Sequence, residues 1–175
     1  MNRFLDWLPR SIERVTEAAG IIGALFLPLL ILVVVGNVVL RYGFGLGLVE
    51  LEELQWHLNA VTIMLCLGYA YRHDAHVRVD VLRDEWSATR KAWVEVIGIL
   101  LLLLPFTIGI MWFSWNSFAY SWKIGEGSPM PSGLPARYLV RLLLFSGFAL
   151  LAAQALASLL QAIQIIRSDA PGDLN

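Results

Sequence analysis

The chain has 175 residues, of which 58% are hydrophobic and 15% are charged, and its net charge is −1. Soluble globular domains are about 45–50% apolar and about 25% charged, so a soluble fold of this length would leave too much apolar surface in water. The near-neutral charge argues against a nucleic-acid partner. Cys66 is the single cysteine, so the chain cannot form an internal disulfide. Because it lies in an apolar run, it is interpreted as a small buried hydrophobic residue.

The first 17 residues mix apolar and charged side chains at a spacing typical of an amphipathic helix. Such a helix lies in the membrane interface with its apolar face toward the acyl chains. We therefore predict a short interfacial helix over residues 1–17, in which Pro9 breaks the helix or starts a new turn.

Four stretches without Asp, Glu, Lys or Arg follow, and each is 18 to 27 residues long. Because about 17–25 apolar residues cross a hydrocarbon core about 30 Å thick, each stretch predicts a transmembrane helix. The first is too long for the apolar core of a signal peptide. The predicted fold is an all-α integral membrane protein with one domain over 18–166 and a tail over 167–175. Its four predicted spans are about 18–40, 54–71, 93–122 and 138–166.

Lysine and arginine are distributed unevenly between the connecting segments. Nine of the 13 lie in residues 1–17, in the 72–95 loop and in the tail, and the other four lie in the two remaining loops. By the positive-inside rule, both termini and the 72–95 loop are predicted to be cytoplasmic. The 41–53 and 123–141 loops then face outward, which is the periplasm if the chain lies in a bacterial inner membrane.

The 72–95 loop alternates polar and apolar residues along its first part. The alternation fits a strand, but an isolated strand is marginal without partners, so a turn followed by a short amphipathic segment is preferred. His76 and Asp80, four residues apart, either hold this loop in place locally or contact a partner. Ser87 is the predicted N-cap of the third helix.

The predicted spans carry few groups that could perform chemistry or transport alone. His57 is the only histidine inside them, which argues against a bis-histidine haem, and a hydrogen-bonded packing role is preferred. Glu50, Glu52 and Glu53 precede the second span, where carboxylates favour the positive end of a helix dipole. An ion pair between this acidic group and Arg41 is the other hypothesis. Because a short loop cannot build a catalytic cleft, we predict no enzyme activity.

The fourth span repeats alanine every four residues, at Ala149, Ala153 and Ala157. A face of small residues lets another helix approach closely. Packing within this chain and contact with another subunit account for the repeat about equally well.

Several motifs, in their order and spacing, resemble one membrane-protein family over roughly residues 15 to 165. The motifs are Asn37-Val38-Val39-Leu40-Arg41-Tyr42, Glu52-Glu53-Leu54 with Trp56, Gly68 and Arg72, His76-Val77-Arg78-Val79-Asp80-Val81-Leu82, and Ser121-Trp122, Glu126, Ser128 and Gly133-Leu134-Pro135. Together they resemble the small membrane subunit of tripartite ATP-independent periplasmic (TRAP) transporters, the Q subunit or DctQ-like family. The last group is similar to the outer loop of the branch associated with 2-oxo acids, mannitol or chloroaromatic acids.

The resemblance implies a non-enzymatic accessory subunit of a sodium-driven transporter for an organic acid. It implies two protein partners: a large (M-type) membrane subunit that binds substrate and sodium and moves as an elevator, and a periplasmic solute-binding (P-type) protein. The chain would brace the large subunit in the lipid and help to form the docking surface, with no cofactor of its own. The residues expected at partner interfaces or in structural motifs are Asn37, Arg41, Tyr42, Glu52, Glu53, Trp56, His76, Asp80, Trp122 and Glu126.

Two other classes of function stay open at this point. A membrane anchor of a redox enzyme complex would show haem absorption when purified. A stand-alone small exporter or channel would move solute when reconstituted by itself. The transported acid is not identified, because the pockets that select it would lie in other chains.

Overall fold

The computed structural model describes residues 2–75 and 86–168, with side chains from Trp7 onward, and all regular structure in these ranges is helical. The connections between the long helices run through residues 44–48 and 125–137. The helices are α1 (Asn2–Gly43), α2 (Val49–Arg72), α3 (Ala88–Gly98), the π-helical turn η2 (Ile99–Leu103), α4 (Leu104–Ile124) and α5 (Tyr138–Ser168).

Three helical rods are long and apolar enough to cross a membrane: Trp7–Gly43, Ala88–Ile124 and Tyr138–Ser168. The second predicted span, α2, does not meet this standard, because Gln55, His57 and Asn59 interrupt the apolar side chains in its first half. The described residues therefore confirm an all-helical structure with three helices of membrane-spanning length and composition, whereas the fourth crossing stays a prediction.

The N-terminal segment differs from the prediction in one respect. The interfacial helix was expected to break or restart at Pro9, but α1 runs without interruption through Pro9 and Pro28. A proline inside a helix removes one backbone hydrogen bond and crowds the preceding turn. Pro9 is buried, so packing of its ring offsets part of that cost.

The third rod begins at Ser87, as predicted, and contains an irregular turn near its middle. The Ser87 hydroxyl accepts a hydrogen bond from the backbone N–H of Arg90, which caps α3. At η2 the N–H of Leu104 donates to the carbonyl of Ile99, five residues back instead of four. Pro105 follows directly and has no N–H to give, so the wider turn accommodates it without ending the helix.

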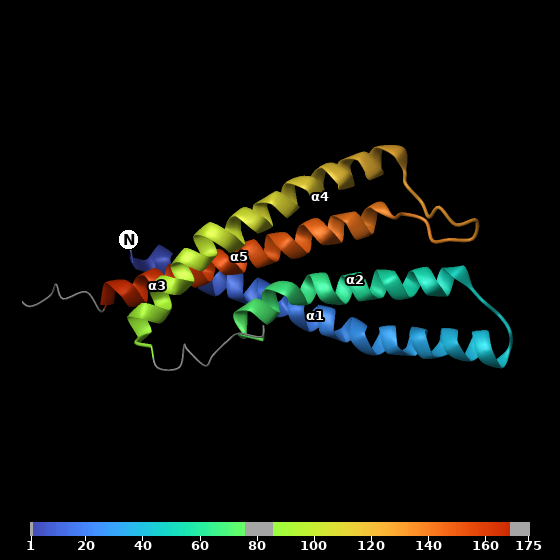
Figure 1. The fold of residues 1–175 in the computed structure, drawn as a ribbon, viewed down its shortest axis with the longest axis horizontal. Coiled ribbons are helices and arrows are strands. Elements are labelled where there is room, and N and C mark those ends of the chain that lie inside the picture. The colour runs from blue at the N-terminus through green and yellow to red at the C-terminus, as the bar shows by residue number, and fades with distance from the viewer. Residues whose placement is uncertain (1, 76–85, 169–175) are drawn as a thin grey trace, which may run out of the picture.

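The helices form an open layer in the order α1, α2, α5, α4 (Figure 1). Helix α5 packs against all the others, but in the described residues α4 makes no close backbone contact with α1 or α2, as it would in a closed bundle. The α1–α2 pair and the α4–α5 pair separate toward the end that holds residues 44–48 and 125–137, which we call the loop end. The start of α1 and the end of α5 lie at the opposite, terminal end.

Two glycines allow α2 to approach α5 closely. A Cβ built on Gly147 would lie 2.8 Å from both the Cβ and the carbonyl oxygen of Met64. A Cβ on Gly68 would lie 3.2 Å from the carbonyl oxygen of Leu150. Because backbone atoms cannot move aside, only glycine fits at Gly147. Close backbone approach of this kind is how helices associate in lipid, where no hydrophobic force drives them together.

Replacing Gly147 with alanine is expected to separate α2 from α5 and to destabilise the protein by about 1–3 kcal/mol, the usual cost of overpacking. The matched control is Gly109→Ala in α4, where a Cβ meets nothing within 4 Å. Thermal melting of the helical circular dichroism signal in mild detergent checks both variants. Equal melting temperatures for the two would contradict the role assigned to Gly147.

Candidate functional site

An ion pair connects α1 with α2 at the loop end. The Arg41 guanidinium lies 2.8 Å from a carboxylate oxygen of Glu52. This is the pair expected between Arg41 and the acidic group at the start of the second span. Both side chains are partly exposed, so the pair contributes at most about 1 kcal/mol to stability and mainly sets which residues face each other.

Glu53, next along the chain, attaches the 125–137 segment to α2. One carboxylate oxygen accepts a hydrogen bond from the Ser128 hydroxyl, and the other accepts from the backbone N–H of Leu134 at 2.6 Å. These two bonds, that of Ser128 foremost, lower the pKa of the Glu53 carboxyl. The attachment therefore persists at neutral pH, and acid weakens it only below the ordinary glutamate value, as the lowered pKa is passed.

The 125–137 segment also folds back on itself. The N–H of Ser128 donates to the carbonyl of Leu134, and the N–H of Arg137 donates to the carbonyl of Glu126. A Cβ on Gly133 would clash with Ser128, so the glycine is needed for this close packing. The segment is thus a compact, hydrogen-bonded turn.

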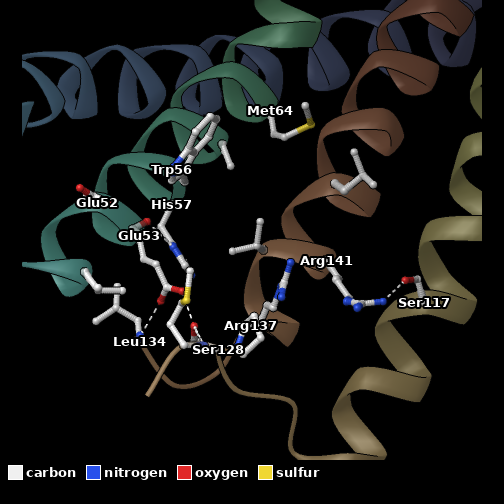
Figure 2. Close-up of a pocket in the computed structure, with 16 residues that line it drawn as sticks. Glu52, Glu53, Trp56, His57, Met64, Ser117, Ser128, Leu134, Arg137 and Arg141 are labelled. Carbon is white, nitrogen blue, oxygen red and sulfur yellow. Dashed lines mark hydrogen bonds between the residues drawn. The ribbon is translucent and has the colours of Figure 1, made fainter. Parts of the chain in front are cut away.

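Glu126 and Arg141 anchor the other side of this turn. The Arg141 guanidinium lies 2.7 Å from a carboxylate oxygen of Glu126 and also donates to the Ser117 hydroxyl on α4. Figure 2 shows Arg141 directed away from α2, toward Ser117. One arginine at the start of α5 thereby joins α4, α5 and the turn.

A pocket of about 670 Å³ lies at the loop end between α2 and α5. One face of each helix lines it, α2 from Val49 to Met64 and α5 from Val140 to Leu144, and the 125–137 segment closes its end (Figure 2). Its volume falls within the range of about 300–1,000 Å³ typical of small-molecule sites.

A second polar cluster holds α1, α2 and α5 together at the terminal end. The Arg72 guanidinium lies 2.6 Å from a carboxylate oxygen of Glu17 and donates to the carbonyl of Glu13 at 2.9 Å. His73 contacts the same carboxylate of Glu17. Gln161 on α5 donates to the Glu13 carboxylate at 2.6 Å. Both ends of α2 are therefore fixed by charged groups.

The other predicted site residues lie apart from these clusters. Asn37 is buried in α1, and Tyr42 is 82% exposed near the end of that helix. Trp56 lines the pocket but is 73% exposed, and Trp122 packs edge-on against Tyr138. His76 and Asp80 lie outside the described residues, as does the 76–85 part of the loop that they were expected to hold, so both interpretations of this pair stay predictions.

Sequence reasoning did not single out Arg141, Ser117 or the terminal-end cluster. Glu17 and Arg72 are 55 residues apart, so no local spacing could reveal their contact. Arg141 was counted only among the basic residues of the outward-facing loops. A cation next to an apolar span is nevertheless a signal that a carboxylate such as Glu126 is near. Within the described ranges, no group of three or more His, Cys, Asp or Glu side chains could hold a metal ion. The clusters join helices and hold a surface turn in shape.

Replacing Glu53 with alanine is expected to release the 125–137 turn from α2. The matched control is Glu50→Ala, one turn nearer the start of α2 and exposed. Because the Leu134 amide loses its charge-assisted hydrogen bond, its hydrogen exchange should be about tenfold faster in Glu53→Ala than in the control. Unchanged exchange at Leu134 would show that the carboxylate does not hold the turn.

Comparison with known proteins gives one match. Residues 30–165 match the family model described as tripartite ATP-independent periplasmic transporters, DctQ component. No curated protein and no solved structure matches the chain.

Proposed function

We infer the role of this chain from its family, because it belongs to the DctQ component family of tripartite ATP-independent periplasmic transporters. We propose that it braces the larger membrane subunit of such a transporter. Membership makes the chain a small membrane subunit of a transporter and not an enzyme. Its role within the assembled transporter is what we propose. The single observation that carries it is the open layer of helices, which leaves α4 packed on one side only.

The uncovered flank of α4 is the surface we assign to the large subunit. Two of the exposed aromatic side chains of α4, Trp112 and Phe113, lie away from the ends of the rod, where aromatic belts form, whereas Phe106 packs against Phe148 of α5. On α1, by contrast, the exposed residues between Ile21 and Val39 are all aliphatic. Aromatic residues are enriched in the cores of protein interfaces, and aliphatic ones suit lipid. The α4 flank therefore faces protein, and the α1 flank faces lipid.

Bracing has a physical purpose in an elevator-type transporter. If one part of the large subunit slides through the bilayer, another part must stay fixed. A wide layer of helices increases the area that anchors the fixed part in the lipid. Charge clusters at both ends of α2 keep that layer from shearing.

We propose that α2 is a fourth crossing, with both termini in the cytoplasm of a bacterial inner membrane. Two observations support this topology. The beginning of α1 and the end of α5 lie at the same end (Figure 1), and most basic residues belong to the segments predicted to be cytoplasmic.

The loop end is the proposed docking surface for the periplasmic solute-binding protein. The turn over 125–137 is held by Glu53 and Arg141 from two helices, so it presents a preformed surface. A preformed surface loses less conformational entropy on binding than a free loop does. We further propose sodium-driven uptake of an organic acid, with sodium and acid bound by the large subunit and no cofactor in this chain.

The bracing role is tested by truncating the α4 flank in the assembled transporter. Phe113, which is 74% exposed, is changed to alanine, and the matched control is Leu32→Ala on α1, which is 69% exposed. If Phe113 is an interface anchor, its loss lowers recovery of the large subunit with the tagged chain by about tenfold or more. Sodium-dependent uptake of labelled carboxylates should fall in parallel. Equal recovery with both variants would overturn the assignment of this flank.

The topology is tested by labelling engineered cysteines in intact cells with a thiol reagent that does not cross the membrane. Cys66 is first replaced by alanine, and single cysteines are then placed at Ser132 and, in a second variant, at Arg90. The proposal expects labelling at 132 and none at 90 until the cells are opened. Labelling at 90 in intact cells, with or without labelling at 132, would contradict the proposed topology.

A further inference from the structure

The pocket between α2 and α5 has the shape of a slot that begins at the loop end and runs into the apolar part of the layer. Along α2 its lining extends from Val49 to Met64, which is about 22 Å at the helical rise. Half of a bilayer about 40–45 Å thick, with the headgroup regions included, is about 20–22 Å. The slot therefore spans roughly one leaflet in depth.

The lining changes in character along this depth. The inner part is apolar, formed by Ala60 and Met64 from α2 and by Val140 and Leu144 from α5. The charged residues of the lining, Glu52, Glu53, Arg137 and Arg141, lie nearer the 125–137 turn than Met64 does (Figure 2). An occupant that fits both parts has a long apolar portion and one polar head.

Among the four charged residues that line the pocket, Arg137 alone has a side chain without a direct hydrogen bond or ion pair to another described residue. Glu52 is paired with Arg41, and Arg141 is paired with Glu126. Glu53 is occupied by Ser128 and by the Leu134 amide.

Arg137, in contrast, has neither an ion pair within 4.0 Å nor a side-chain hydrogen bond in the part of the chain that the structure describes, and the carboxylates of Glu53 and Glu126 attract its charge only from a longer distance. It directly precedes α5, whose first turn contains no acidic residue, so the helix dipole adds to the positive potential there.

The wall also contains a polar atom without a partner. The Nδ1 atom of His57 lies 2.7 Å from the carbonyl oxygen of Glu53, as a packing role for this histidine requires. Its Nε2 atom is buried and has no hydrogen-bond partner among the described residues. His57 lines the pocket near its mouth, so Nε2 can bond a polar group of an occupant. Buried ring nitrogens are seldom left without such a partner.

We propose that this pocket binds one anionic phospholipid of the leaflet at the loop end. One acyl chain lies between α2 and α5 against Met64 and Leu144, and the phosphate lies at Arg137. The lipid fills the space where the two helix pairs separate and stands in for a direct contact between them. This inference concerns the chain's own pocket and holds whichever solute the transporter carries.

Native mass spectrometry of the purified full chain tests the proposal. The chain is stripped of lipid in detergent and mixed with phosphatidylglycerol, which is anionic, or with phosphatidylcholine, which has no net charge. We expect one phosphatidylglycerol per chain, bound about tenfold more tightly than phosphatidylcholine, because the choline cation of phosphatidylcholine offsets the attraction between its phosphate and Arg137. Equal binding of the two lipids, or no one-to-one complex, overturns the proposal, and so does displacement of the lipid by inorganic phosphate.

Variants locate the binding to the pocket. Arg137→Gln should remove the preference for phosphatidylglycerol, whereas Lys123→Gln should keep it, because Lys123 is an exposed cation near the same end that does not line the pocket. Ala60→Phe, which fills the slot, should abolish one-to-one binding of both lipids. The helical circular dichroism of each variant is measured first. A folded Ala60→Phe variant that still binds one lipid would overturn the proposal.

Cross-linking in the assembled transporter separates a lipid from a segment of a partner. A photoreactive amino acid replaces Leu144 in the wall of the pocket, and the membranes are irradiated. A product heavier by the mass of a phospholipid supports the proposal. A product that contains a second polypeptide shows that a partner segment occupies the pocket and overturns it. A cross-link to a partner polypeptide is compatible with the bracing role. Failure of the lipid proposal is therefore distinguishable from failure of the bracing proposal.

Discussion

The close packing of α2 against α5 joins the two halves of the molecule. In lipid the apolar side chains gain nothing by leaving one hydrocarbon environment for another, so helices hold together through close contact and polar bonds. Gly147 lets the backbone of α2 come close to α5, and Arg72 and Glu53 secure the two ends of α2. Because α4 relies on α5 alone, separation of α2 from α5 would leave the contact of α1 with α5 to hold the two helix pairs together in the described part of the chain.

The polar groups of the chain are concentrated at the ends of the helices. Charged side chains pair with each other at the loop end and at the terminal end. The hydroxyls of the long rods mostly bond backbone carbonyls three or four residues back, as Ser114 does in α4. Such local bonds satisfy polar atoms without a partner helix, which leaves the faces of the layer apolar and free for lipid or protein.

The sequence alone predicts where the long helices lie along the chain, but it does not predict how they pack against one another. Charge-free runs located the long rods, and the Ser87 cap and the pairing of Arg41 with Glu52 followed from local patterns. The terminal-end cluster did not, because Glu17 and Arg72 meet only after two helices have packed. The alanine repeat suggested a close contact along α5, but the tightest approach to α2 uses Gly147, which lies outside that repeat. The residue pattern of one helix does not determine which of its faces packs against a neighbouring helix.

The π-helical turn over Ile99–Leu103 affects the rest of its rod. One extra residue in a single turn changes the phase of a helix by about 100°, the angle between successive residues. The side chains beyond Leu103 are therefore rotated relative to those of α3. The rod can turn Ala92 and Val96 toward α5 at one end and still point Phe113 outward at the other. The two parts of the rod thus serve different neighbours, although no loop divides them.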